Sequence, residues 1–215
     1  KYATVASSVT LVTTSPFFVA GFAFLFAGER TSRRMFLAIA VCTAGGLIIG
    51  AADLTVGGRA LLGDGLALAG AVFAAAYFAL GRSVRMRVSL LGYVGIVYPI
   101  AALALLATTI LARQPLSGFS PETYLMLALL ALVSQLIGHS SLNWALGYLS
   151  APFVSITVLG EAVLATALAA VFLAEPPGLE RIAGGVLILT GVFMALREED
   201  AAKIRGNVGE IAVGG

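Results

Sequence analysis

Two ionisable side chains lie deep inside long apolar segments of this sequence and are its strongest candidates for chemistry. Glu161 stands near the middle of segment 152–174, within TVLGEAVLA, and His139 stands in segment 124–146. Ionisable groups inside a membrane are costly, so each is a functional hypothesis by default. Because low-dielectric surroundings favour a neutral carboxyl group, Glu161 could exchange a proton or balance a substrate amine. The alternative is a protonated carboxyl group whose hydrogen bond fixes helix packing.

A polar stripe formed by Gln135, His139 and Asn143 recurs every four residues, which places the three on one face of a helix. Such a face must point into the bundle or a wet cavity, since lipid cannot satisfy its hydrogen bonds. The stripe predicts either a cavity lining for polar substrate groups or interhelical hydrogen bonds of about 0.6–2 kcal/mol each. Trp144 could add an aromatic wall, although tryptophan is also enriched at membrane interfaces.

Three further residues are candidates because they accompany features that shape cavities. Tyr77 and Tyr98 lie within apolar segments, and Pro99 directly follows Tyr98. A proline inside a helix frees a backbone carbonyl and can kink the helix. Ser15 is likewise followed by a proline. Kinks serve cavities and gates, and they are also common in plain packing.

The surroundings of these residues are overwhelmingly apolar. Hydrophobic residues make up 60% of the 215 positions and charged residues 11%, with a mean hydropathy of +1.01, whereas an average soluble chain is about a quarter charged. This composition excludes a disordered chain, a nucleic-acid-binding domain and a disulfide scaffold. The single cysteine, Cys42, and the single histidine lie on different segments and make a poor ligand set, so neither metal nor cofactor is expected.

Seven apolar segments are bounded by charges or turn residues and approach the length of about 20 residues that a membrane helix needs. They are 4–27, 35–51, 65–80, 91–111, 124–146, 152–174 and 182–196. The connections between them are short, so neighbouring helices must be antiparallel. The sequence therefore predicts an all-α fold, a polytopic membrane helix bundle.

Lysine and arginine residues are divided unevenly between the two sides of this predicted bundle. If the chain enters its first segment from outside, nine of the 13 basic residues lie inside and four outside. Cytoplasmic loops carry the positive excess in membrane proteins, so the carboxyl terminus is predicted to be cytoplasmic. The tail, residues 197–215, is charged and ends in glycines, and we expect it to be a mobile cytoplasmic segment.

An internal repeat emerges when the first 50 residues are shifted by 146 positions. The shift pairs identical residues, among them Tyr2 with Tyr148, Glu29 with Glu175 and Gly45 with Gly191. An odd number of segments separates the copies, so they would have opposite orientations, as in the inverted repeats of secondary transporters. With a five-helix unit, residues 57–196 form a complete second repeat. Residues 1–56 then hold the last two helices of a first repeat truncated by three.

Several stretches resemble the EamA-like transporters of the drug/metabolite transporter superfamily. Those similar to the family's second half are GDGLALAGAVFAAAYFALGRSVR, LVSQLIGHSSLNWALGYLSAPFVSITVLGEAVLATALAAVFLAE and ERIAGGVLILTGVFMAL, and KYATVASSVTLVTTSPFFVAGFAFLFAGER resembles the end of the first half. The resemblance implies ten helices in two inverted five-helix repeats, both termini cytoplasmic, and export or exchange of small metabolites. One departure is Ala174, where a glycine commonly precedes the glutamate.

We therefore expect a secondary transporter of the cytoplasmic (inner) membrane that exports or exchanges small metabolites such as amino acids or amines by alternating access. Its cavity would be lined by Glu161, Gln135, His139 and Tyr77. The expected partners are the lipid bilayer, a small-molecule substrate and protons. The sequence leaves open whether two copies form a homodimer.

The alternatives are a non-transporting channel subunit and a receptor. A channel subunit would show neither competition between solutes nor dependence on a pH gradient. An intramembrane enzyme is disfavoured because His139 and Ser140 diverge by about 100° on a helix and cannot form a nucleophile–base pair. The sequence also has no HExxH or Gly-x-Ser-x-Gly motif.

Overall fold

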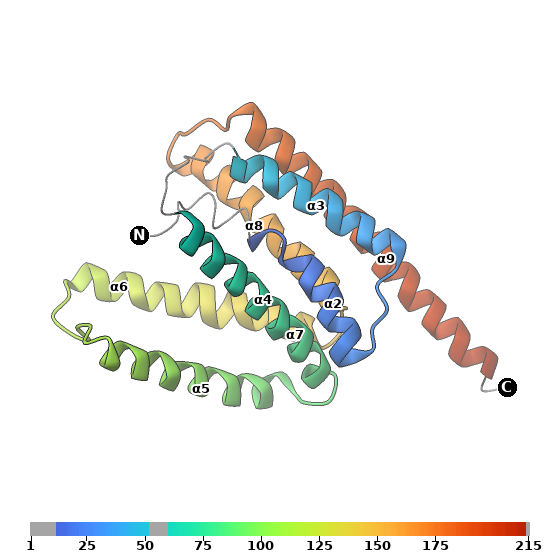
Figure 1. Cartoon of the computed structure of the whole chain (residues 1–215), viewed down its shortest axis with the longest axis horizontal. Helices are drawn as coiled ribbons and strands as arrows, with labels where there is room; N and C mark the ends of the chain where they lie inside the picture. Colours follow the sequence, from blue (N-terminus) through green and yellow to red (C-terminus); the bar gives the residue numbers. More distant parts are fainter. Residues whose placement is uncertain (1–11, 52–59, 214–215) are drawn as a thin grey trace. The chain divides into compact units, whose positions relative to one another are not determined.

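The long apolar runs of this chain fold into helices because a helix satisfies backbone hydrogen bonds within itself, which a lipid environment requires. The structure is a computed structural model that describes residues 12–51 and 60–213. Throughout those ranges the regular elements are helices (Figure 1), and six are long and apolar enough to cross a membrane. The predicted all-α polytopic membrane helix bundle is confirmed.

The helices follow the predicted segments with shifts of a few residues at their ends. They are α2 (Ser15–Ala27), α3 (Arg33–Ala51), α4 (Ala60–Arg85), α5 (Leu90–Leu111), α6 (Pro121–Leu129), η1 (Leu130–His139), α7 (Ser140–Ala145), α8 (Ala151–Phe172) and α9 (Leu179–Val213). The start of predicted segment 4–27, and Tyr2 with it, lie outside the described residues.

Two predicted segments differ from the helices that form. Segment 124–146 is built as three consecutive pieces, α6, η1 and α7, and η1 has the wider turns of a π-helix. The tail after Leu196, which we expected to be a mobile segment, is helical as far as Val213, because α9 continues to that residue. The tail sequence REEDAAKIRG explains this, because it is rich in residues with good helix propensity.

The chain divides into two compact units, which we describe separately. The first unit comprises residues 1–80 and 149–215, and the second comprises residues 81–148. The first therefore contains α2, α3, α8, α9 and most of α4. The second contains the last turn of α4 together with α5, α6, η1 and α7.

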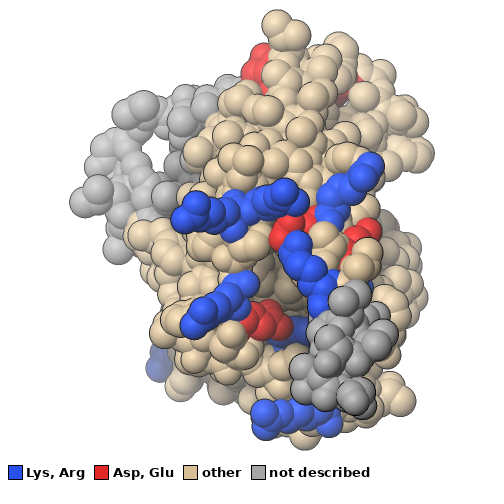
Figure 2. Space-filling model, turned by 90° about the vertical axis from the view of Figure 1, so that its right-hand side faces the viewer, with Lys and Arg blue, Asp and Glu red and all other residues tan. Residues whose placement is uncertain are grey.

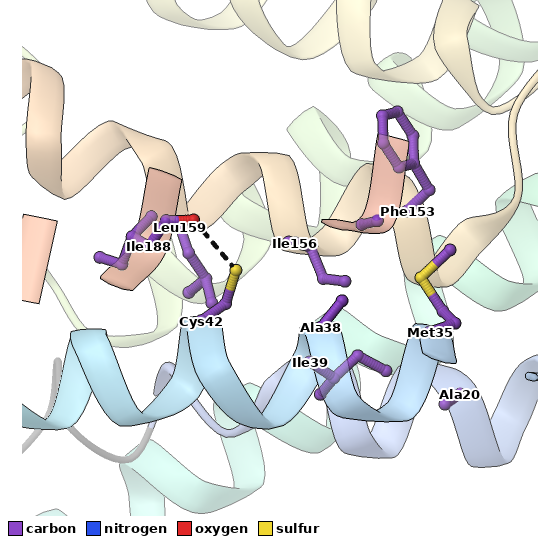
Figure 3. Packing of buried hydrophobic residues seen from close by; sticks show 10 residues of the cluster. Ala20, Met35, Ala38, Ile39, Cys42, Phe153, Ile156, Leu159 and Ile188 are labelled. Carbon is purple, nitrogen blue, oxygen red and sulfur yellow. Dashed lines mark hydrogen bonds between the residues drawn. The ribbon is translucent and has the colours of Figure 1, made fainter. Parts of the chain in front are cut away.

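The core of the first unit lies where α2, α3, α8 and α9 meet (Figure 3). Its buried hydrophobic residues are Ala20, Met35, Ala38, Ile39, Cys42, Phe153, Ile156, Leu159, Ile188 and Ala195. Helices α3 and α9 lie side by side along much of their length (Figure 1) and run antiparallel, as the contacts of Gly45 with Gly184 and of Cys42 with Gly191 require.

Glycines bring α3 and α9 unusually close. A Cβ atom added to Gly45 would lie 2.5 Å from the carbonyl oxygen of Gly184, and one added to Gly184 would lie 2.6 Å from that of Gly45. On Gly191 an added Cβ would collide with the Cys42 thiol. Small residues permit such backbone approach in membrane helix pairs. The close packing of α3 against α9 therefore requires glycine at these three positions.

The contacts between α3 and α9 are reciprocal at the 146-residue shift. Gly45 packs against Ile188, and Gly191, which lies 146 positions after Gly45, packs against Cys42. The Cys42 thiol donates a hydrogen bond to the Ile188 carbonyl oxygen at 3.3 Å, and these two residues are themselves 146 positions apart. The interface is thus self-complementary, as expected where two equivalent elements pack about a two-fold axis.

Helices α2 and α8 end in the same kind of turn. Gly28 ends α2 with a left-handed backbone (φ 66°), and the Glu29 N–H donates to the Ala23 carbonyl oxygen at 3.1 Å. Ala174, 146 positions after Gly28, is also left-handed (φ 54°), and the Glu175 N–H donates to the carbonyl six positions back at 3.4 Å. This six-to-one bond is typical of helix ends that favour glycine.

We expect Ala174→Gly to raise the free energy of unfolding by about 1 kcal/mol. A left-handed backbone costs a residue with a Cβ atom about 1–2 kcal/mol, whereas glycine adopts it freely. Thermal unfolding in detergent should therefore shift upward by about 2–4 °C. The matched change is Gly28→Ala, since nothing lies within 4 Å of the added Cβ and only the backbone is affected. Gly28→Ala makes the reverse change at a left-handed residue, so it should lower the unfolding temperature by a similar amount. Shifts in the same direction for the two variants would contradict the interpretation.

Candidate functional site

Glu161 lies on α8, well inside a 22-residue apolar span, and its side chain is exposed. Burial changes along this helix: residues 151–156 are all buried, and none is buried from Glu161 to the end of α8. A Cβ atom added to the neighbouring Gly160 would meet nothing within 4 Å. Glu161 therefore faces outward from the first unit, at the level where α8 leaves the packed core.

The other two predicted site residues of the first unit are half-buried. Tyr77 on α4 sits edge-on against Phe78, with ring centroids 5.7 Å apart. Ser15 begins α2 and is followed by the buried Pro16 at the first helical positions, where proline is well tolerated. The structure places Pro16 in the first turn of α2.

The predicted polar stripe divides between two kinds of environment in the second unit. Gln135 and His139 lie on η1 with exposed side chains, whereas Asn143 on α7 is completely buried. The change from π-helical to α-helical turns falls between His139 and Asn143. Wide turns of this kind are frequent at functional sites, so Gln135 and His139 stay predicted substrate contacts.

Asn143 is held by a hydrogen-bond network that joins α7 to α5. Its side-chain amide donates to the Tyr98 hydroxyl at 3.2 Å, and the Tyr98 hydroxyl shares a hydrogen bond with the Ser140 hydroxyl at 3.0 Å. Buried polar groups need such partners, because an unsatisfied one costs about 1–3 kcal/mol. Tyr98 and Asn143, both predicted from the sequence, are thus brought together within one unit.

We expect Tyr98→Phe to lower the free energy of unfolding by about 1–2 kcal/mol, because it removes the hydroxyl that the buried Asn143 amide uses. Chemical unfolding in mixed micelles would measure the change. Tyr148→Phe is the matched control, since the Tyr148 side chain is exposed and contacts Trp144 through its ring, with centroids 5.0 Å apart. A loss of equal size in the two variants would argue against the network.

Two arginines that the sequence offered only as inside charges cap the end of α7. Arg85 is buried, and its Nε donates to the Asn143 carbonyl oxygen at 2.9 Å. Arg82 donates to the Leu146 carbonyl oxygen at 3.0 Å, and Arg85 also donates to that of Val88. The last carbonyls of a helix lack partners within it and attract positive charge. No spacing rule linked α4 to α7, so sequence reasoning missed this role.

A pair of carboxylates in α9 was also missed, because both residues follow the last predicted span. The Glu199 carboxylate accepts hydrogen bonds from the Ser150 backbone N–H at 2.8 Å and hydroxyl at 2.6 Å, where α8 begins. The Glu198 carboxylate lies 2.7 Å from the Arg205 guanidinium and 4.0 Å from that of Arg34. Figure 2 shows acidic side chains lying among basic ones on the face that it draws. The Glu198 and Glu199 carboxylates fasten α9 to the starts of α8 and α3.

The described residues contain no candidate metal site, because no group of three or more His, Cys, Asp or Glu side chains among them could hold an ion. Carboxyl and imidazole groups inside a membrane span instead suit contact with a polar solute or a proton. Glu161 is the residue of this kind nearest to the middle of a described span.

The chain resembles known proteins in both its fold and its sequence. A solved structure described as "Crystal structure of protein" resembles it with a TM-score of 0.74 at 21% sequence identity, over 94% of this chain and 70% of that chain. That likeness shows a shared fold. Among curated proteins none matches the chain. The sequence model of the EamA-like transporter family matches residues 61–197, well over half of the 215 positions, and the chain belongs to this family of membrane transporters.

Proposed function

We propose that the protein is a secondary transporter that exchanges or exports small metabolites by alternating access. The observation that carries the proposal is Glu161, a carboxyl group placed in a 22-residue apolar span with its side chain outside the packed core. A membrane carboxyl group is too costly to keep on an outward face without a partner that uses it. A passing solute or proton is such a partner.

The chemistry of a carboxylate sets the class of substrate. It attracts a positive charge and accepts hydrogen bonds from an ammonium group. We therefore propose amines and zwitterionic amino acids as the substrates, with Glu161 as the group that binds the amine or a coupled proton. Gln135 and His139, exposed on η1, are proposed to contact the polar groups of the same solutes.

The repeat supports alternating access. Helix α3 begins at Arg33 and α9 at Leu179, 146 positions apart, and the two run antiparallel with reciprocal contacts. Inverted repeats give secondary transporters two exchangeable conformations that open to opposite sides. We propose that α2–α3 and α8–α9 are corresponding parts of two such repeats, with residues 1–56 belonging to the first and 57–196 to the second.

The charge distribution supports an orientation in the cytoplasmic membrane. In the first unit, Glu198 lies close to both Arg34, at the start of α3, and Arg205 of α9, so the two arginines lie at one end of this unit. Both arginines belong to the predicted inside group, which is the side that basic residues favour. We therefore propose that this end and the carboxyl terminus face the cytoplasm.

Solute counterflow in proteoliposomes tests the function. Vesicles holding the full-length protein are loaded with one unlabelled amine or amino acid, and entry of the same labelled solute is followed. A carrier predicts transient, saturable accumulation that requires the internal solute. A channel subunit predicts entry that never exceeds equilibrium and does not saturate. Absence of accumulation across amines, amino acids and neutral metabolites would remove the proposal.

A further inference from the structure

Most positive charges of the second unit lie at one end of it. Between residues 81 and 148 the only acidic residue is Glu122, at the start of α6, while Arg82, Arg85 and Arg87 all lie around the end of α4. Glu122 and the end of α7 are separated by almost the whole helical run of α6, η1 and α7. Within this unit, three positive charges at one end therefore have no carboxylate beside them.

Two of these arginines donate hydrogen bonds to backbone carbonyl oxygens, and the third is exposed. Arg85 is buried and donates hydrogen bonds to the backbone carbonyl oxygens of Asn143 and Val88. Arg82 donates a hydrogen bond to the Leu146 carbonyl oxygen. Arg87 is exposed, and no described side chain bonds to its guanidinium. Arg34 and Arg205 of the first unit differ, since both lie against Glu198.

Exposed aromatic rings stand at the same end of the unit. Trp144 and Tyr148 are more than half exposed, and their ring centroids lie 5.0 Å apart. The hydrogen bond of Arg85 to the Asn143 carbonyl places this aromatic pair next to the end of α4. Tryptophan and tyrosine favour the headgroup level of a bilayer, where one edge of the ring is wet and the rest is apolar.

Exposed apolar side chains lie next to Arg87 in the chain. Met86 and Val88 flank it in sequence with exposed side chains, and Leu91 in the first turn of α5 is 81% exposed. A guanidinium between exposed apolar groups matches a phospholipid, which offers a phosphate to the arginine and acyl chains to its neighbours. Arginine binds phosphate with two parallel hydrogen bonds.

We propose that this end of the second unit, formed by Arg87, Met86, Val88, Trp144 and Tyr148, is a binding site for an anionic phospholipid. Arg87 contacts the headgroup phosphate, and the two aromatic rings lie at the headgroup level beside it. Arg82 and Arg85 add positive charge without leaving their backbone partners. The site does not depend on the proposed transport activity, because it requires only that the chain spans a membrane.

Trp144 is the only tryptophan of the chain, so its fluorescence reports on this site alone. The protein is placed in nanodiscs of phosphatidylcholine with an equal minor fraction of brominated phosphatidylglycerol or brominated phosphatidylcholine. We expect the brominated anionic lipid to quench Trp144 about fivefold more strongly, the enrichment that one arginine gives near an anionic headgroup. Equal quenching by the two lipids would overturn the proposal.

Two variants separate this site from general attraction of the protein for anionic lipid. Arg87→Gln should remove most of the excess quenching, while Arg113→Gln, at the end of α5 far along the chain from α7, should keep it. An unchanged thermal unfolding curve, followed by far-UV circular dichroism of the whole protein, checks that both variants are folded. Excess quenching that survives Arg87→Gln would overturn the proposal. Loss of the excess on adding inorganic phosphate, but not chloride of equal ionic strength, would assign a free anion instead of a lipid.

Discussion

Gly45→Ala is expected to lower the free energy of unfolding by about 3 kcal/mol, at the upper end of the usual cost of overpacking. The added Cβ would lie 2.5 Å from the Gly184 carbonyl oxygen and 2.9 Å from Ile188 Cγ1 and N. Two of these three atoms belong to the backbone, which cannot turn aside as a flexible side chain can. The only relief is for α3 and α9 to move apart, which loses packing along the whole interface.

The only cysteine of the chain supplies the measurement. Cys42 is fully buried in the α3–α9 interface, so the reaction of its thiol with a fluorescent maleimide during heating reports the opening of that interface. Gly45→Ala should bring this reaction to a clearly lower temperature. Gly184→Ala should do the same, because its Cβ meets the Gly45 carbonyl oxygen at 2.6 Å.

Gly21→Ala is the control for the change of residue type. It lies inside α2 of the same unit, and a Cβ there would meet nothing within 4 Å. Alanine is the better helix former by about 1 kcal/mol, so this variant should be unchanged or more stable. A loss in Gly21→Ala equal to that in Gly45→Ala would mean that the close approach of α3 and α9 contributes little.

The second large effect concerns transport. We expect Glu161→Gln to reduce counterflow of an amine about 10- to 100-fold, since a charge-assisted contact with the substrate becomes a neutral one. Stability should change little, because the Glu161 side chain is exposed and leaves no buried partner behind. Unchanged Cys42 reactivity on heating would confirm that the loss comes from function and not from folding.

Much of the fold could be predicted from hydropathy, because a membrane span requires an apolar run of sufficient length. The helices α3, α5 and α8 begin and end within a few residues of the predicted segments. The extension of α9 beyond Leu196 was not predicted, since the prediction counted apolar residues and stopped at the charges after Leu196. Charged residues end a membrane span, but they do not end a helix.

The sequence could indicate which residues belong to the candidate site, but it could indicate only in part which of their side chains are buried. Spacing placed Asn143 with Gln135 on one face, yet the structure buries Asn143 against Tyr98 and leaves Gln135 exposed. Contacts between helices decide which residues of a face are enclosed, and a single sequence does not contain them. The hydrogen bond by which Arg85 caps the end of α7 could not be predicted for the same reason.

The departure from the family at Ala174 shows what a repeat adds to a single motif. From the sequence alone it was a missing glycine before a glutamate. In the structure it is a left-handed alanine that corresponds, at the 146-residue shift, to Gly28. The same shift relates Cys42 to Ile188 across the α3–α9 interface. Sequence identities suggested the repeat, and its proposed two-fold relation now has contacts that can be tested.

The most direct test of the central claim is amine counterflow by Glu161→Gln beside Glu175→Gln, at two pH values, in proteoliposomes of the full-length protein. Both variants replace one carboxylate by an amide, but Glu175 lies in the connection after α8 and not in a span. The account predicts that Glu175→Gln exchanges like wild type and that Glu161→Gln loses exchange or its dependence on pH. Robust, pH-dependent exchange by Glu161→Gln would contradict it.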